Sequence, residues 1–421
     1  MRAEPLRRRL WRRLGSRARG LEVVAHEARR LGTSSFLVGG PVRDLLAGAP
    51  IGDLDVLLDG NLEAVARGSA RSLGGHVRLH LRFLTARVEA GPLSLDLARA
   101  RRERYPHPGS LPRVEPATLE DDFARRDFSI HAMALPLEPA SGGELLDPFG
   151  GARDLRERWL RILHPASFDD DPTRLWRAVR YASRLRLRWT PATLRARRAA
   201  LARRVLDRVS GDRLARELWR TLEEPRISAA LALADRSGVL GATCPGSALR
   251  PAAHRALRAL EGLRTRPPWP QAAEAETRAA CGLRLIWLAA PPSVRREAWR
   301  RLGYRGRRSA RLEADLAALP GLLRALARRP SDGRVDALLH GLGEPALLAL
   351  FCAGDRNARS AVRRYACDLR LRASPVDGRR LRALGFRGVA LGRALRRARA
   401  RSLDGRLVDD AWLRRLAPRD S

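Results

Sequence analysis

The hydrophobic pattern changes once along the chain, near residue 150, and this change limits the possible folds more than any other feature. Before it, short apolar runs are broken by glycine, and part of the stretch HVRLHLRFLTARVEAGPLSLDLA (76–98) alternates polar and apolar residues, as half-buried strands do. After ELLDPFGG (144–151), apolar residues recur at helical i, i+3 and i+4 spacing. We therefore predict an α+β multi-domain protein with a mixed-sheet head followed by helices.

The same patterns predict four parts of the chain. A basic N-terminal segment at 1–22 precedes the head at 23–152, a helical neck follows at 153–230, and a helical body with a basic tail occupies 231–421. A chain of 421 residues is long enough for several domains of ordinary size. Each of the three larger parts can therefore hold a hydrophobic core.

Arginine dominates the charge of the chain. There are 82 basic and 46 acidic residues, a formal net charge of +36, and the basic residues in this count are all arginine. A genome rich in G and C explains the choice of arginine over lysine but not the excess of positive charge. This excess favours an anionic partner, most simply nucleic acid, over a merely solvated surface.

Several classes of protein do not fit the sequence. No apolar run approaches the ~20 residues that a bilayer-spanning helix needs, so we expect no membrane contact. The four cysteines lie far apart, without a CxxC pair or histidines at zinc-ligand spacing, so we expect neither a disulfide framework nor a zinc site. The N-terminus lacks the apolar stretch of a secretory signal. We expect a mature protein in the reducing cytoplasm.

A glycine turn follows the first predicted strand. The sequence FLVGGPVRDLLA (36–47) runs from apolar strand residues through Gly39 and Gly40 into an amphipathic helix that carries Arg43. Backbone N–H groups at a helix N-terminus attract anions. The turn is therefore predicted to face a phosphate group.

Three aspartates follow on predicted strands. Asp53 and Asp55 lie two apart in the run DLDVLL, so both side chains leave the same face of the strand. Asp96, in the later run LSLDLA, could approach from a neighbouring strand. Adjacent carboxylates repel unless a cation lies between them, and such oxygen ligands suit Mg²⁺. The alternatives are a solvated strand edge for the pair and an ordinary strand-end acid for Asp96.

An arginine pair follows at RRDFSIHAMAL, where a helical turn is predicted to end and a strand to begin. Arg125 and Arg126 can neutralise phosphates, and Asp127 can orient one of them or bind a ribose hydroxyl. A solvated charged turn is the alternative.

A further helix is predicted in FDDDPTRLWRAVRYASRL (168–185), with Asp171 as its cap and Pro172 as its first residue. Its apolar residues form one buried stripe. A second face, suited to a base and a phosphate backbone, carries Arg174, Arg177, Tyr181 and Arg184.

In this order, the motifs resemble those of the class II tRNA nucleotidyltransferase and bacterial poly(A) polymerase family. The matching motifs are GGxVRD, DxD, RRDF[ST]I, DPxRxxRAxRY and SGDRLARELWRTL, which cover about 36–225. Members of this family add CCA, or parts of it, to tRNA 3′ ends, or extend RNA with adenosines, without a nucleic-acid template. The resemblance implies a nucleotidyltransferase head like that of DNA polymerase β.

The resemblance also assigns roles to single residues. Asp53 and Asp55 become the catalytic metal ligands for Mg²⁺, with Asp96 as a third ligand. The implied substrate-binding residues are Gly39, Gly40, Arg43, Arg125, Arg126, Asp127, Asp170, Asp171, Arg174, Arg177 and Arg180.

Base selection is implied for Asp170, Asp171 and Arg174, which fall on the family's Glu-Asp-x-x-Arg motif. Cytosine and adenine both present an amino donor beside a ring-nitrogen acceptor, which an acceptor on Asp171 and a donor on Arg174 can pair with, whereas uracil and guanine present the reverse pattern. Residues 101–111 take the place of the family's flexible loop, which helps CCA-adding members to switch to ATP. This argues against an enzyme restricted to CC addition.

Four positions depart from the family pattern. His131 replaces the usual Asn, Leu84 a Gly, Trp176 a Leu and Asp170 a Glu. The shorter Asp170 puts its role in positioning the base-reading arginine in question. We expect His131 to be a packed or hydrogen-bonded group and not a catalyst.

The predicted function is template-independent addition of CCA, or of its terminal A, to tRNA 3′ ends from CTP and ATP, with Mg²⁺ and release of pyrophosphate. The basic helices beyond residue 230 are expected to bind the tRNA acceptor arm by shape and phosphate contacts. The alternatives are a bacterial poly(A) polymerase and a catalytically silent RNA-binding protein of the same fold.

Overall fold

The computed structural model divides into two compact units, Met1–Val209 and Ser210–Ser421. The predicted neck, 153–230, spans this division, so the four-part organisation stays a prediction. The residues described are 2–106, 109–110, 112–138 and 144–416.

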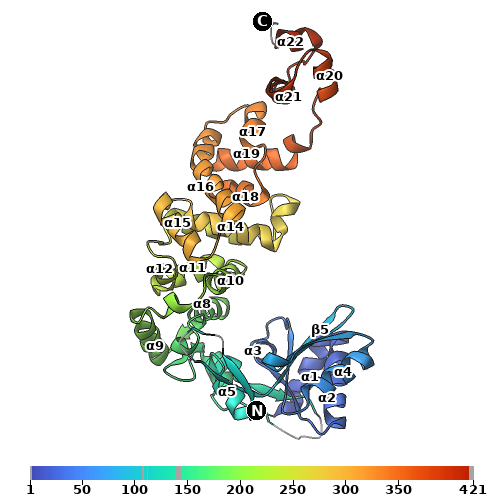
Figure 1. Cartoon of the computed structure of the whole chain (residues 1–421), viewed down its shortest axis with the longest axis vertical. Coiled ribbons are helices and arrows are strands. Elements are labelled where there is room, and N and C mark those ends of the chain that lie inside the picture. Colours follow the sequence, from blue (N-terminus) through green and yellow to red (C-terminus); the bar gives the residue numbers. More distant parts are fainter. Residues whose placement is uncertain (1, 107–108, 111, 139–143, 417–421) are drawn as a thin grey trace. The chain divides into compact units, whose positions relative to one another are not determined.

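A six-stranded mixed sheet forms the centre of the first unit, which confirms the predicted mixed-sheet head (Figure 1). Its order is β3-β4-β5-β2-β1-β8, and all neighbours are antiparallel except β2 and β5. The strands are β1 (Ser35–Val38), β2 (Leu54–Leu58), β3 (His76–His80), β4 (Thr85–Ala90), β5 (Leu93–Arg99) and β8 (Ala134–Pro136).

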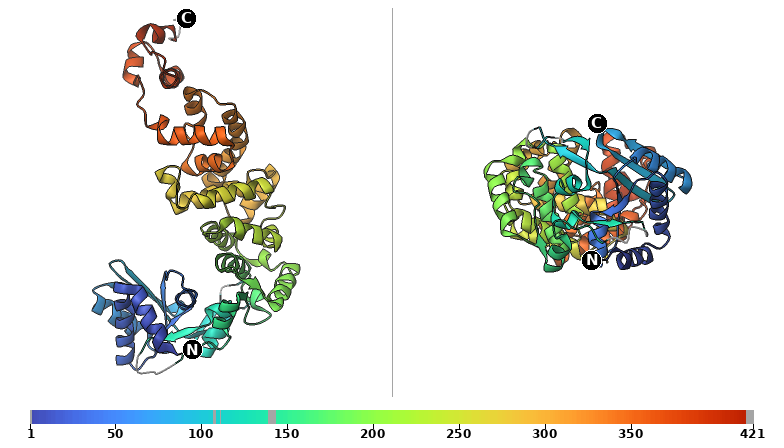
Figure 2. Two further views of the ribbon diagram at one scale, coloured as in Figure 1. Left: turned by 180° about the vertical axis from the view of Figure 1, so that it is seen from behind. Right: turned by 90° about the horizontal axis from the view of Figure 1, so that it is seen from below.

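Helices α1 to α4 pack against this sheet, and the N-terminal ones gather on one side of it in both Figure 1 and the left view of Figure 2. Two short strand pairs lie outside the sheet, β6 (Arg101–Arg104) with β7 (Arg113–Pro116) and β9 (Trp159–Leu160) with β10 (Arg188–Trp189). The helices are α1 (Ala3–Leu14), α2 (Ala18–Arg30), α3 (Gly40–Ala47), α4 (Leu62–Leu73), α5 (Leu119–Ala124), α6 (Gly151–Glu157), α7 (Ser167–Asp170), α8 (Arg174–Leu185) and α9 (Pro191–Ala202).

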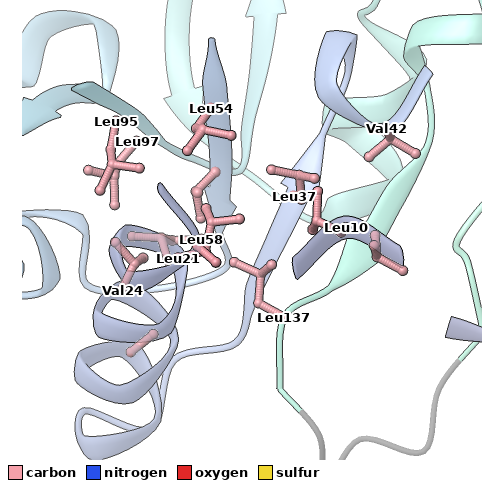
Figure 3. Packing of buried hydrophobic residues seen from close by; sticks show 14 of the residues in the cluster. Leu10, Leu21, Val24, Leu37, Val42, Leu54, Leu58, Leu95, Leu97 and Leu137 are labelled. Atoms are coloured by element: carbon pink, nitrogen blue, oxygen red, sulfur yellow. The ribbon is translucent and has the colours of Figure 1, made fainter. Parts of the chain in front are cut away.

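The main core lies between these helices and the sheet. Alternate residues of β2, Leu54, Val56 and Leu58, are buried in this core, because side chains on a strand point to opposite faces in turn. Figure 3 shows Leu54 and Leu58 in this core. Leu57 enters a second core on the other face, the face that also carries Asp55. The strand thus has one fully apolar face and one face that changes from acidic to apolar.

The N-terminal segment belongs to the head and does not stand apart at 1–22 as we predicted. Leu6, Leu10 and Leu14 of α1 are buried in the main core together with Leu21 of α2. Figure 3 shows Leu10 and Leu21 there. The arginine cluster concealed this pattern, because arginines stand between the apolar residues at i, i+4 and i+8, and one of them, Arg7, is itself buried.

The second unit is helical, with no strand among its described residues 210–416. Val376, Leu381, Phe386, Ala394 and Leu413 form a small core of their own near its C-terminal end. Throughout the part of the chain that the structure describes, no helix combines the length and apolar content needed to cross a membrane. The helices are α10 (Gly211–Leu222), α11 (Ile227–Arg236), α12 (Val239–Thr243), α13 (Pro251–Gly262), α14 (Ala275–Trp287), α15 (Pro292–Arg301), α16 (Gly306–Ala327), α17 (Asp332–Leu339), α18 (Glu344–Ala353), α19 (Arg356–Cys367), α20 (Gly378–Ala383), α21 (Gly388–Leu403) and α22 (Asp410–Arg415).

Candidate active site

A cavity of about 800 Å³ in the first unit gathers residues that the sequence spreads over more than a hundred positions. All the predicted site residues line it except Asp170 and Arg180. The predicted residues that line it are Gly39, Gly40, Arg43, Asp53, Asp55, Asp96, Arg125, Arg126, Asp127, Asp171, Arg174 and Arg177.

The glycine turn lies at one edge of this cavity. Gly39 has φ +69°, and a Cβ atom there would lie 3.2 Å from Nη1 of Arg126, so both its conformation and its surroundings favour glycine. Helix α3 begins at the next residue with Pro41 in its first turn, as the sequence predicts. Its Arg43 is buried and donates to both carboxylate oxygens of Asp44, at 2.8 and 2.9 Å. The turn therefore presents a fixed guanidinium group at the cavity.

The carboxylate wall of the cavity consists of Asp53, Asp55 and Asp96. Strands β2 and β5 are parallel neighbours, and Asp55 and Asp96 are partners in their register, which places Asp96 on the neighbouring strand as the sequence suggests. Burial, and then the charges of Asp96 and Asp53, raise the pKa of Asp55 to about 6. The three carboxylates thus act on one another electrostatically.

Arg87 is a member of this region that sequence reasoning missed. Its Nε and Nη2 atoms donate to the two carboxylate oxygens of Asp96 at 2.7 and 2.8 Å. The two residues are opposite each other on β4 and β5, and only the register of those strands reveals this. Asp53 and Asp55, in contrast, have no side-chain hydrogen bond or ion pair with any other residue that the structure describes.

The donor set of this wall suits a hard divalent cation, because carboxylate oxygens are its preferred ligands and three carboxylates line the same cavity. Among the described residues, no group of three or more His, Cys, Asp or Glu side chains is yet arranged as a metal site. The metal roles of Asp53, Asp55 and Asp96 therefore stay predictions.

The arginine wall of the cavity consists of Arg125, Arg126, Arg174 and Arg177. Asp122, which sequence reasoning missed, is fully buried and accepts hydrogen bonds from Arg125 at 2.6 and 2.9 Å and from Arg126 at 2.8 and 3.1 Å. Burial raises the pKa of Asp122, but Arg126 and Arg125 outweigh burial and hold it below its usual range. The two adjacent arginines thus share one buried counterion.

Both carboxylate oxygens of Asp127 accept hydrogen bonds from other groups of the protein. Its Oδ1 accepts from the Phe128 N–H at 2.9 Å and lies 2.8 Å from Nδ1 of His131, while its Oδ2 accepts from Arg177, with Nε at 2.7 Å. Asp127 thus holds Arg177, and not Arg125 or Arg126 as we predicted, because those two arginines are bonded to Asp122. The substrate-binding role of Asp127 stays a prediction.

Helix α8 begins at Arg174 and not at Pro172, which corrects the predicted helix start. The Oδ1 of Asp171 accepts from the N–H and hydroxyl of Thr173 at 3.1 and 2.7 Å, so Asp171 closes a tight turn before the helix. Arg174 is buried, with its Nη1 donating to Oγ of Ser167 at 2.8 Å. Asp171 and Arg174 both face the cavity, as the base-reading prediction requires.

Asp170 and Arg180 lie away from the cavity lining. The carboxylate of Asp170 is 3.6 Å from Nε2 of His164, and Arg180 is buried with its guanidinium carbon 5.5 Å from the ring centre of Tyr181. Trp176, another departure from the family pattern, is fully buried. The substrate-binding roles of Asp170 and Arg180 stay predictions.

Two further cavity residues, Glu103 and Tyr105, belong to the segment we compared with the family's flexible loop. The Tyr105 hydroxyl donates to Glu103 at 2.8 Å, and burial together with Glu103 raises the pKa of Tyr105. The other oxygen of Glu103 accepts from Arg125 at 2.8 Å. His107, Pro108 and Leu111 of this segment lie outside the described residues.

The chain is similar in sequence to tRNA nucleotidyltransferases and in structure to CCA-adding enzymes. The poly A polymerase head domain family matches residues 35–161. An A-adding tRNA nucleotidyltransferase of Halalkalibacterium halodurans is 46% identical over 202 residues, 47% of each chain, and a CC-adding tRNA nucleotidyltransferase of Deinococcus radiodurans is 42% identical over 225 residues, 52% of this chain and 58% of that one. The chain thus spans about half the length of these relatives.

Solved structures match over nearly the whole chain. An apo form of a CCA-adding enzyme has a TM-score of 0.83 at 27% identity, covering 98% of this chain and 97% of the other. A Thermotoga maritima CCA-adding enzyme complexed with tRNA has a TM-score of 0.76 at 26% identity, covering 99% and 97%.

Proposed function

Because the chain belongs to the class II tRNA nucleotidyltransferase family, we propose that it adds CCA, or the terminal A of CCA, to tRNA 3′ ends from CTP and ATP. One observation carries this proposal: a single cavity unites the glycine turn, the carboxylate wall and the arginine wall. The reaction is attack of an RNA 3′-hydroxyl on the α-phosphorus of the nucleotide, with pyrophosphate leaving.

The carboxylate wall is the proposed site for Mg²⁺. Asp53 and Asp55 would hold the ion, with Asp96 beside them on the adjacent strand. A bound divalent cation would favour ionisation of the attacking hydroxyl and neutralise charge on the triphosphate. Arg87 would keep Asp96 in position through its paired hydrogen bonds.

The remaining cavity residues would bind and select the nucleotide. Arg43 and the start of α3 would contact the triphosphate, as would Arg125 and Arg126. Asp171 and Arg174 would pair with the amino and ring-nitrogen groups of cytosine or adenine. Because Arg174 is buried and held by Ser167, its donors would be offered at a constant place, which base selection requires.

The net charge of +36 supports tRNA as the partner, since phosphate contacts supply sequence-independent affinity. We propose that the helical second unit contributes these contacts at the acceptor arm, and that the protein acts in the cytoplasm. Addition of the terminal A alone is a second candidate, favoured by the A-adding relative.

A gel at single-nucleotide resolution tests these functions. The purified protein receives Mg²⁺, CTP and ATP with tRNA lacking CCA, tRNA ending in C, or tRNA ending in CC. Growth of all three to the same CCA end supports complete addition, and extension of only the CC-ended tRNA by one A supports the A-adding activity. A long ladder of A would indicate a poly(A) polymerase. No extension under any condition would refute the proposal and leave a silent RNA-binding protein.

A further inference from the structure

A buried chain of polar side chains joins two arginines of the cavity that belong to different helices. Arg43 lies on α3 beside the glycine turn, and Arg177 lies on α8. Between them stand His131, in a 3₁₀ turn at Ser129–His131, and Asp127. All four side chains line the cavity, and His131 and Asp127 are both buried.

The hydrogen bonds run without a break from one arginine to the other. Nη1 of Arg43 lies 2.6 Å from Nε2 of His131, and Nδ1 of His131 lies 2.8 Å from Oδ1 of Asp127. The opposite oxygen of Asp127 accepts from Nε of Arg177 at 2.7 Å. His131 therefore links a cation, Arg43, to an anion, Asp127, through hydrogen bonds on its two ring nitrogens.

Chemistry decides where the imidazole proton lies. A guanidinium group only donates, so Nε2 must accept from Arg43, and the proton must lie on Nδ1, which donates to Asp127. Burial lowers the pKa of His131 to about 4, although Asp127 opposes this, so the ring is neutral at physiological pH. A neutral ring with one donor and one acceptor matches both neighbours.

We propose that His131 is a positioning residue for nucleotide binding: it sets the spacing between Arg43 and Arg177 by accepting a hydrogen bond from the first and donating one to the carboxylate that holds the second. This inference rests on the proposed function of the cavity. It gives His131 no contact with the reacting atoms.

Packing around the ring supports a role in spacing. The ring of Tyr181 meets His131 edge-on, with centroids 4.3 Å apart, and the guanidinium carbons of Arg43 and Arg177 lie 5.3 and 5.6 Å from the Tyr181 ring centre. Tyr181 thus contacts the same two arginines that His131 links. Removing the hydrogen bonds of His131 would leave both arginines near an aromatic face but without a common anchor.

The test compares two variants of matched size, His131→Asn and His131→Leu. An amide offers a donor and an acceptor in one plane, whereas leucine offers neither. We expect His131→Leu to raise the KM for ATP or CTP by about tenfold to a hundredfold, the cost of a lost bond to a charged group, with kcat changed less than about threefold. His131→Asn should stay within about threefold of the unchanged protein in both. His76→Leu is the control, because His76 is exposed on β3.

Titration of ATP into the same proteins separates this inference from the proposed function. If the unchanged protein adds no nucleotide to any tRNA, the proposed function fails. The ATP dissociation constants of the unchanged protein and the His131 variants would still test whether His131 positions the two arginines. If His131→Leu does not fold, the pair His131→Gln and His131→Met gives the same comparison of an amide with an apolar group, with longer side chains. An unchanged nucleotide affinity in the apolar variant, or equal losses in the amide and apolar variants, would overturn the positioning role.

Discussion

The two walls of the cavity use aspartate in opposite ways. In the carboxylate wall, burial and then the charges of Asp96 and Asp53 raise the pKa of half-buried Asp55 to about 6. In the arginine wall, Asp122 is fully buried, but two arginines bond it and hold its pKa below the usual range. Two arginines thus compensate the charge of Asp122, whereas burial and neighbouring acids disfavour the charged form of Asp55.

This difference distinguishes Asp122, a carboxylate with a structural role, from Asp55, a carboxylate with a proposed catalytic role. Burying an unbalanced charge costs stability, so a fold that retains one gains nothing in stability from it. A buried carboxylate that anchors two arginines instead fixes the shape of the wall. Substitutions in the two walls should therefore have different consequences, and four predictions test the contrast in order of decreasing effect.

The largest expected effect is loss of activity without loss of stability in the carboxylate wall. Asp53→Ala and Asp55→Asn should lower nucleotide addition at least about a thousandfold, because each removes a proposed metal ligand worth several kcal/mol. RNA binding should remain, and Asp55→Asn should unfold at no lower temperature than the unchanged protein at pH 7. Primer-extension kinetics, gel shifts and thermal unfolding measure these three quantities.

Asp59→Asn is the matched control, since Asp59 directly follows β2 and its Oδ1 accepts from the Ser34 N–H at 2.7 Å. Its activity should stay within about threefold. Retained activity in Asp53→Ala would remove the metal assignment.

The second prediction is a loss of stability in the arginine wall. Asp122→Asn should lower the free energy of unfolding by about 3 kcal/mol, because two arginines lose a buried counterion. Asp121→Asn should cost less, because Asp121 is only partly buried and pairs with Arg102 near the surface, although it also caps α5. Urea unfolding of both variants gives the comparison. Equal losses would mean that burial does not distinguish the two aspartates.

The third prediction is an opposite pH dependence for the two walls. The folded pKa of Asp55 is raised, so its favourable contribution is present below its unfolded value of about 3.9 and is lost as pH rises through about 6. Asp55→Asn should therefore gain stability relative to the unchanged protein, by up to about 3 kcal/mol, between pH 4 and pH 7.

Asp122 has a lowered folded pKa, so its contribution is present above about 3.9 and is lost as pH falls through the folded value. The cost of Asp122→Asn should therefore shrink below about pH 4. Unfolding measured across this range gives both slopes, and slopes of the same sign would contradict the contrast between the walls.

The smallest expected effect concerns the support of the carboxylate wall. Leu84 precedes β4, the strand of Arg87, with φ +52°, a conformation that costs a non-glycine residue about 1 kcal/mol. Leu84→Gly should therefore stabilise the protein by about 1 kcal/mol without changing kcat. Leu79→Gly, on the regular strand β3, should destabilise it instead. A loss of stability in both variants would show that Leu84 gains more from packing than it loses in strain.

Much of the site was readable as local patterns. The glycine turn, the Asp53–Asp55 pair and the arginine face of α8 all follow from local spacing, and the structure places each of them at the cavity. Asp53 does not lie on the strand as we predicted, because β2 begins at Leu54. Residues 1–22 were misjudged because their arginines concealed a buried leucine stripe. The start of α8 was misplaced by two residues, because an aspartate followed by proline is typical both of a helix cap and of the tight turn that Asp171 forms.

Asp122 was overlooked although its spacing was readable, since it lies three and four residues before Arg125 and Arg126. Other partners were not readable, because they come from other elements. Arg87, for example, meets Asp96 through strand register. The link from Arg43 through His131 joins residues 88 positions apart. No spacing rule reaches that far.

The sequence by itself determined which side chains carry chemistry and on which face of a strand or helix they lie, since the strand and helix periods are local properties of the backbone. Only the tertiary structure decided which of them meet, and therefore which aspartate is compensated and which is not. The reason is physical: a pKa depends on burial and on charges within a few ångströms, and those distances exist only once the sheet and the helices pack together.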